Sequence, residues 1–413
     1  MNIIGDELAT TGRLRSYLTP TQSPATKAGG SMRTGMPRQP AFPALLGISG
    51  AGFAGLYLLF AVVPVLAATE GGRVGAGLAT AVFMGATVTL QALTPRLMAV
   101  VRPHVLLGAS LLLLGLPTVL YAVRPSLVPL LLITALRGAG FGLVTVVGTG
   151  LVSAYTAPER RGAALGVYGL TTSTAGIASP SIGLLLLHSS ASQTTYWLGA
   201  AVPVAALGLL FVIRKASPGP VGAEDGPGRT LRVAWRDPRL RATAMLFFPC
   251  AVGYGAVYTF LPLLSADAPA GLLAFGAGFA AARLGFGRVA DVVRPALLAV
   301  PLLGLAALGI VATATFPGGY GLIVSVAAAG AGMGGMATVS LVEVMSAVRT
   351  GESPLAAAMW NLTFDVGIAS GGLALGVVAQ LAGYRSVFVV SAVAIVLALA
   401  GAVAQLRRPP TRA

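Results

Sequence analysis

Long apolar runs separated by short polar gaps dominate this chain. A helix needs about 20 mostly apolar residues to cross the hydrocarbon core of a bilayer. Twelve runs come close to that length, and they cover residues 43–67, 75–98, 104–122, 127–154, 163–188, 195–213, 241–264, 270–288, 296–316, 320–343, 354–381 and 385–405. The pattern therefore predicts an all-α membrane protein with 12 transmembrane helices.

The chain also contains an internal repeat with a period just under half its length. Three short segments recur at an offset of 191 or 192 positions: 138–142 with 330–334, 176–179 with 367–370, and 100–103 with 292–295. Repeated segments at one spacing indicate a duplicated structural unit. We expect two pseudo-symmetric six-helix bundles, residues 43–213 and 241–406, joined by a cytoplasmic linker, 214–240. The flanking segments 1–42 and 407–413 are expected to be cytoplasmic tails, the first of them disordered.

Composition excludes most soluble classes. Charged residues make up 9% of the chain and hydrophobic residues 56%, with a mean hydropathy of +0.85, whereas a soluble domain carries about 25% charged residues. The net charge is +15, but the basic residues lie in short gaps between apolar runs. Because no basic helix or aromatic–basic surface is present in the sequence, we expect no nucleic-acid partner.

The basic residues also indicate an orientation in the membrane. If the N-terminus is cytoplasmic, the cytoplasmic segments hold 22 of the 27 lysines and arginines. Cytoplasmic loops of membrane proteins carry such an excess of positive charge. The sequence therefore predicts a multi-pass protein of the cell membrane with both termini in the cytoplasm.

Residue types that carry enzymatic or metal chemistry are rare and scattered. Cys250 is the one cysteine, and His104 and His188 are far apart in the sequence, so a disulfide framework or metal site is not expected. A phosphate-binding loop needs Gly-Lys-Ser or Gly-Lys-Thr, but Lys27 and Lys215 are each followed by alanine. We expect no enzyme activity and no cofactor, with a proton gradient as the energy source.

A short motif between the eighth and ninth apolar runs resembles a known family signature. Arg283, Gly287, Arg288 and Asp291 resemble the signature between helices 8 and 9 of the major facilitator superfamily. The resemblance covers roughly residues 43–406. It implies two six-helix halves that enclose a central site, and it assigns these four residues to gating.

Other parts of the resemblance concern the first half. At the equivalent place after the second helix, Ala99 replaces the expected aspartate. Arg137 on the fourth helix resembles the arginine of the proton-coupled branch. Gly166, Pro180 and Gly183 on the fifth helix resemble a softened copy of the exporter signature. The resemblance therefore implies the drug:proton antiporter branch and an export direction.

One acid lies deep in an apolar run. Asp365 is about twelve residues into the eleventh helix, or roughly 18 Å along its axis, near mid-membrane. An ionisable residue at such depth is a functional-site hypothesis by default. We expect Asp365 to carry the proton, with Asn361 bonding the carboxyl from one turn away and Arg137 as electrostatic partner. The alternative is a fixed structural hydrogen bond between helices, for example from Asp365 to Gln91.

Glu343 is expected at the cytoplasmic end of the tenth helix. A surface ion pair with Arg283 or Arg288 is the preferred interpretation, and a second proton site is the alternative.

Three tyrosines are candidate substrate contacts. Tyr57 lies on the first helix, and Tyr254 and Tyr258 lie one turn apart on the seventh, on helices that line the central cavity in the resembled family. Tyrosine offers an organic substrate both a ring face and a hydroxyl, although ordinary helix packing explains these residues equally well. Gln91 is assigned to the same cavity.

These observations together predict a monomeric secondary transporter in the lipid bilayer. The favoured function is proton-coupled efflux of a small lipophilic or amphipathic organic compound by alternating access, because few charges lie within the helices. A facilitator or proton-coupled importer of the same fold is the nearer alternative. An integral-membrane enzyme is the remote one, because it would need a cluster of catalytic residues.

Overall fold

The computed structural model describes residues 40–157, 160–189, 192–216, 235–290, 292–348 and 353–406. Contacts divide the chain into residues 1–38 and one unit of residues 39–413, and the described residues belong to the second. These residues form helices and short connections, with no strand among them. The expected C-terminal tail lies outside the described residues, and so do residues 1–39 of the N-terminal tail and residues 217–234 of the linker.

The described helices follow the twelve apolar runs closely. The first half contains α2 (Ala41–Phe60), α3 (Val62–Val100), α4 (Pro103–Gly115) continued by the 3-10 helix η2 (Leu116–Val123), α5 (Leu127–Ala154), α6 (Arg161–Leu187), and α7 (Ser192–Ala205) continued through η4 (Ala206–Leu209) into α8 (Leu210–Ala216). The second half contains α10 (Pro238–Leu264), α11 (Ala268–Val289), α12 (Pro295–Thr315), α13 (Gly319–Ser346), α14 (Ser353–Ala382) and α15 (Tyr384–Leu406).

Eleven helical segments among the described residues are long and apolar enough to span a membrane, and one of them is double. The segment Ala41–Val100 has 60 residues, which corresponds to roughly 90 Å of helix, three times the thickness of the hydrocarbon core. Its backbone leaves the helical conformation at Gly71 and Gly72, and Gly72 has a φ of +62°. This break divides the segment into two crossings, which confirms the 12-helix fold.

The glycines of the repeated segments make equivalent helix contacts in the two halves. Each glycine of the repeated segment packs directly against backbone of a neighbouring helix, where a Cβ atom would collide. The equivalent pairs, each displaced by 192 positions, are Gly138 on Phe83 and Gly330 on Phe275, then Gly142 on Thr87 and Gly334 on Phe279. Small residues allow such close approach of membrane helices. The α3–α5 contact is therefore repeated as the α11–α13 contact.

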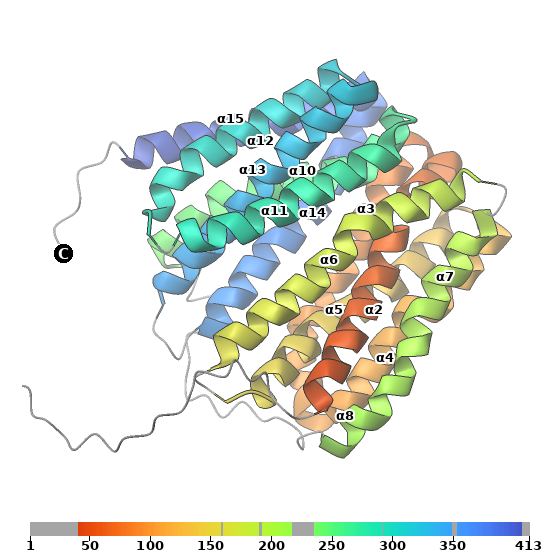
Figure 1. The fold of residues 1–413 in the computed structure, drawn as a ribbon. Coiled ribbons are helices and arrows are strands. Elements are labelled where there is room, and N and C mark those ends of the chain that lie inside the picture. The colour runs from red at the N-terminus through yellow and green to blue at the C-terminus, as the bar shows by residue number, and fades with distance from the viewer. Residues whose placement is uncertain are drawn as a thin grey trace, which may run out of the picture. The chain divides into compact units, whose positions relative to one another are not determined.

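The same correspondence relates the two interfaces between the halves. Helix α3 packs along α14, and α6 packs along α11 (Figure 1). Because α3 corresponds to α11 and α6 corresponds to α14, these interfaces are equivalent under a pseudo-twofold relation. The two halves are thus the pseudo-symmetric bundles predicted from the repeat.

Two glycines of α6 from the exporter-like signature lie in opposite environments. Gly183 packs against the backbone carbonyl of Leu58, whereas a Cβ atom at Gly166 would meet nothing within 4 Å. We expect Gly183→Ala to destabilise the fold by about 1–3 kcal/mol because it overpacks the α2–α6 contact. Gly166→Ala, the matched control, should leave stability unchanged or raise it by up to about 1 kcal/mol through helix propensity. Thermal unfolding of both purified variants measures the difference, and equal midpoints would contradict the assignment.

Candidate functional site

Asp365 of α14 lies in the α3–α14 interface between the two halves. Its side chain is 7% exposed. Gln91 Nε2 on α3 donates a hydrogen bond to Asp365 Oδ2 at 2.8 Å and another to Thr145 Oγ1 on α5 at 3.2 Å. The carboxyl of one half is therefore held by an amide of the other, through the alternative hydrogen bond considered from the sequence.

Asn361 does not take part in this contact, contrary to expectation. Its side chain is exposed, and its Nδ2 donates to the Ala357 carbonyl of its own helix at 3.0 Å. A short asparagine side chain in a helix readily bonds the preceding turn. The longer side chain of Gln91 reaches Asp365 from the neighbouring helix instead.

Arg137 of α5 makes its hydrogen bonds within the first half and not with Asp365. It is 1% exposed, and its guanidinium donates to the carbonyls of Leu114 (3.3 Å) and Gly55 (3.2 Å). Two ring centroids, those of Phe83 and Tyr121, lie 5.9 Å from its Cζ atom. Arg137, the expected electrostatic partner of Asp365, makes no hydrogen bond or ion pair with it in this structure, because carbonyls and ring faces of the first half surround the guanidinium.

The three candidate tyrosines form one cluster across the halves. Tyr254 donates from its hydroxyl to that of Tyr57 at 3.3 Å, and the Tyr254 and Tyr258 ring centroids are 4.7 Å apart. Tyr254 and Tyr258 are buried, whereas Tyr57 is partly exposed. The cluster joins α2 of the first half to α10 of the second.

Pro180 explains a further contact of this cluster. A proline inside a helix lacks the N–H that would bond the carbonyl four residues earlier, which here belongs to Gly176. The Tyr258 hydroxyl donates to that carbonyl at 3.4 Å. A residue of the second half therefore satisfies the backbone group that Pro180 frees in α6.

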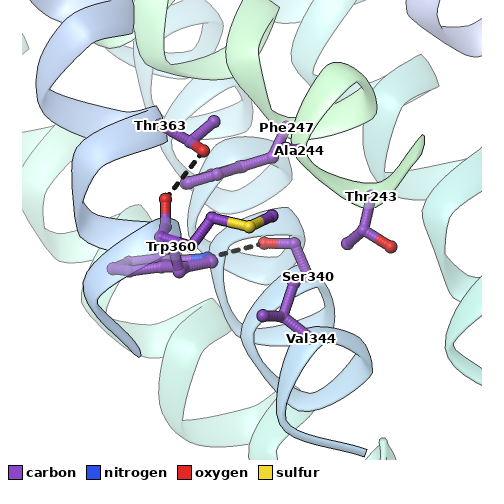
Figure 2. A pocket seen from close by; sticks show the side chains of 8 residues that line it. Thr243, Ala244, Phe247, Ser340, Val344, Trp360 and Thr363 are labelled. Atoms are coloured by element: carbon purple, nitrogen blue, oxygen red, sulfur yellow. Dashed lines mark hydrogen bonds between the residues drawn. The ribbon is translucent and has the colours of Figure 1, made fainter. Parts of the chain in front are cut away.

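Three stacked rings, which we call the aromatic stack, were not singled out from the sequence. Phe247, Trp360 and Phe364 lie with centroids 5.1–5.9 Å apart and planes within 13° of parallel. Trp360 Nε1 donates to Ser340 Oγ at 2.9 Å, which fixes the indole at the crevice shown in Figure 2. The signal was available, because Trp360 and Phe364 lie one turn apart just before Asp365.

Arg283 of α11 extends toward aromatic rings. Its Cζ atom lies 5.8 Å from the Phe279 centroid and 5.9 Å from the Trp360 centroid. Within the described residues Arg283 makes no ion pair with Glu343, which leaves Arg288 as the other expected partner of that acid. Arg283 and Asp365 both interact electrostatically with the Tyr57 hydroxyl. Phe279, over which Arg283 lies, packs against Tyr254. Arg283, which the motif had assigned to gating, therefore adjoins the tyrosine cluster.

The rest of that motif is described only in part. Gly287 lies in the last turn of α11, and a Cβ atom added there would meet nothing within 4 Å. The Arg288 side chain and Asp291 lie outside the described residues, so their predicted gating role and the Glu343–Arg288 pair stay predictions.

No metal site is found in the described part of the chain. Groups of three or more His, Cys, Asp or Glu side chains that could hold a metal ion do not occur there. Cys250 is buried in α10.

Comparisons with known proteins agree with this architecture. A family model described as Major Facilitator Superfamily matches residues 45–316. The fold is similar to the crystal structure of a mutant of the nucleoside transporter NupG, with a TM-score of 0.70 and 12% identity over 89% of this chain and 100% of that chain. It is also similar to a bacterial homolog of the human lysosomal transporter Spinster in an inward-facing, unoccupied conformation, with a TM-score of 0.67 and 14% identity over 91% of this chain and 100% of that chain. At such identities the likeness shows a shared fold, and a comparison with curated protein sequences gives no significant match.

Proposed function

The chain belongs to the Major Facilitator Superfamily, and on that premise we propose that it is a proton-coupled secondary transporter that exports a small lipophilic or amphipathic organic compound. The observation that carries the proposal is the position of Asp365. It is a buried acid in the contact between two pseudo-symmetric halves, and its hydrogen-bond donor belongs to the opposite half.

A carboxyl inside a membrane protein is tolerated when it carries a proton or meets a polar or charged partner. The partner of Asp365 is the neutral amide of Gln91, and Arg137 is occupied by carbonyls elsewhere. Proton binding at Asp365 therefore changes the charge of an interface that must rearrange when the halves rock. This links protonation to conformation without any further cofactor.

The equivalent interfaces α3–α14 and α6–α11 support alternating access. In transporters built from repeats, one half rocks against the other around a central site. The tyrosine cluster joins the two halves, and the aromatic stack of the second half adjoins it through the Tyr254–Phe364 ring contact. A compound bound at the cluster would contact both halves. The aromatic character of the cluster and the stack supports a lipophilic or amphipathic cargo. The export direction is supported by the resemblance of Gly166, Pro180 and Gly183 to the exporter signature.

A facilitator or proton-coupled importer of a small metabolite is the second candidate. The fold likeness to a nucleoside transporter favours considering it, because stacked aromatic rings also suit a nucleobase.

The excess of basic residues in alternate loops supports a cell-membrane location with both termini cytoplasmic, and we expect a monomer.

Proton-coupled flux in reconstituted vesicles tests the proposal. Vesicles of defined protein orientation are loaded with the pH-sensitive dye pyranine and exposed to naphthalenesulfonate, naphthamide or naphthyltrimethylammonium. We expect at least one compound to move against the proton flux and to accumulate when a pH gradient is imposed, relative to protein-free vesicles. Flux that ignores the gradient would favour a facilitator, and proton and compound moving together would favour an importer; either result overturns antiport.

A further inference from the structure

We propose that Arg283 and the aromatic stack form a binding site for a planar aromatic acid with one negative charge. The inference rests on the proposed transport function and specifies its substrate class. It concerns recognition of the cargo, whereas the role of Asp365 concerns coupling to protons, so the two can fail separately.

The first argument is the unmet charge of Arg283. Its guanidinium makes no hydrogen bond or ion pair with any described residue, and it lies over the faces of Phe279 and Trp360. The ionisable groups that interact with it electrostatically are Tyr57 and Tyr254. An arginine within a membrane span usually pairs with an acid or with carbonyls, or marks a substrate pathway. Arg137 pairs with carbonyls. Arg283 has no such partner among the described residues, so we assign it to the substrate pathway.

The second argument comes from the pseudo-symmetry. Arg283 on α11 lies 192 positions after Gln91 on α3, the same offset that relates Phe83 to Phe275. In the α3–α14 interface, Gln91 meets the acid Asp365. The residue of α6 that corresponds to Asp365 is Thr174, whose hydroxyl donates to the Leu170 carbonyl of its own helix. At the position in the α6–α11 interface that corresponds to Asp365, the chain therefore has no acid to pair with Arg283. The negative group of a ligand can take that place.

The third argument is the shape and chemistry around Arg283. The indole of Trp360 is fixed by Ser340 and stacks with the rings of Phe247 and Phe364. The guanidinium lies over the rings of Phe279 and Trp360. Phe279 and the stacked Phe364 are partly exposed, so ring surface is open to a ligand. A flat aromatic body packs against such faces, while the planar fork of arginine suits a carboxylate or sulfonate through two parallel hydrogen bonds.

The number of charges limits the ligand to one anionic group. Arg283 is the single cation at this cluster among the described residues, and the polar groups that interact with it are the hydroxyls of Tyr57 and Tyr254. Asp365, which also interacts with Tyr57, is the one acid nearby among the described residues and adds no positive charge. A second negative charge would be buried without a partner, which is costly. The residues of this site belong to the second half, and Tyr57 of the first half is joined to them through the Tyr254 hydroxyl.

Quenching of Trp360 fluorescence measures binding directly. The protein is purified in nanodiscs with Trp197→Phe and Trp235→Phe, which leaves Trp360 as the reporter, and is titrated with naphthoate or with the isosteric neutral naphthamide. We expect naphthoate to bind roughly ten- to a hundredfold more tightly than naphthamide, the range of one charge-assisted contact. Arg283→Gln should remove that preference, and Arg283→Lys should retain part of it. The exposed Arg294→Gln is the matched control and should change nothing.

The outcomes separate this inference from the transport proposal. Equal binding of naphthoate and naphthamide to the protein with native Arg283, or no quenching by naphthoate at millimolar concentration, overturns the inference whether or not the variants fold. Loss of both compounds on Arg283→Gln also overturns it, since that points to collapsed packing. Because the titration uses no pH gradient, selective naphthoate binding stands even if vesicle flux proves independent of protons.

Discussion

Vesicles carrying Asp365→Asn are expected to lose proton-driven accumulation of substrate, down to the level of protein-free vesicles. Asparagine has the same shape as aspartate and can accept the hydrogen bond from Gln91 Nε2, so the α3–α14 contact should persist. It cannot bind or release a proton in this pH range, so the step that links proton movement to rocking is removed. Substrate binding, by contrast, should stay within a few-fold of the unmodified protein.

The measurement is accumulation under an imposed pH gradient, together with thermal unfolding to confirm folding. Glu70→Gln is the matched control, because it removes an exposed carboxylate and should leave accumulation unchanged. If Asp365→Asn accumulates substrate as before, Asp365 is a packing element of the interface and the coupling proposal fails.

Arg137→Met is expected to destabilise the protein severely. The substitution keeps much of the side-chain volume but removes the donors to the Gly55 and Leu114 carbonyls. Each lost hydrogen bond to the charged guanidinium contributes about 1.5–3 kcal/mol, and the guanidinium also contacts two ring faces. A loss of roughly 3–6 kcal/mol is a large share of the about 5–15 kcal/mol by which folded proteins are typically stable. We therefore expect little folded protein by size-exclusion chromatography and a strongly lowered unfolding temperature.

Arg124→Met provides the comparison, because that arginine is exposed and its loss should be neutral. A stable Arg137→Met protein that has lost proton-driven transport would contradict the structural role of Arg137. It would restore the role expected from the sequence, in which Arg137 acts electrostatically on the proton carrier in some step of the cycle.

The fold was predictable because its determinants are periodic. Apolar length sets the number of crossings, and glycines such as Gly138 and Gly330 repeat at a fixed offset because each allows the same close helix contact. Only the long segment from Ala41 to Val100 leaves the number of crossings open to question, because its helical backbone is interrupted only at Gly71 and Gly72.

The candidate site was predictable in its residues but not in its pairings. Depth along a helix identified Asp365 and Arg137, since position in sequence determines distance along the axis. Partners depend on how neighbouring helices are rotated, and a single sequence does not reveal that. Gln91 rather than Asn361 therefore bonds the acid, and Arg283, assigned to a loop-side motif, lies against Trp360.

The amide of Gln91 carries two hydrogens and one oxygen, and its nitrogen serves both Asp365 and Thr145. A neutral acid offers an O–H group, which the amide can best receive by turning its oxygen toward α14. That turn would withdraw the nitrogen from α14 and reset its bond to the Thr145 hydroxyl. Protonation of Asp365 in the second half would therefore change the orientation of the Gln91 amide in the first half. Because Gln91 also bonds Thr145, this change would reach α5, the helix that carries Arg137.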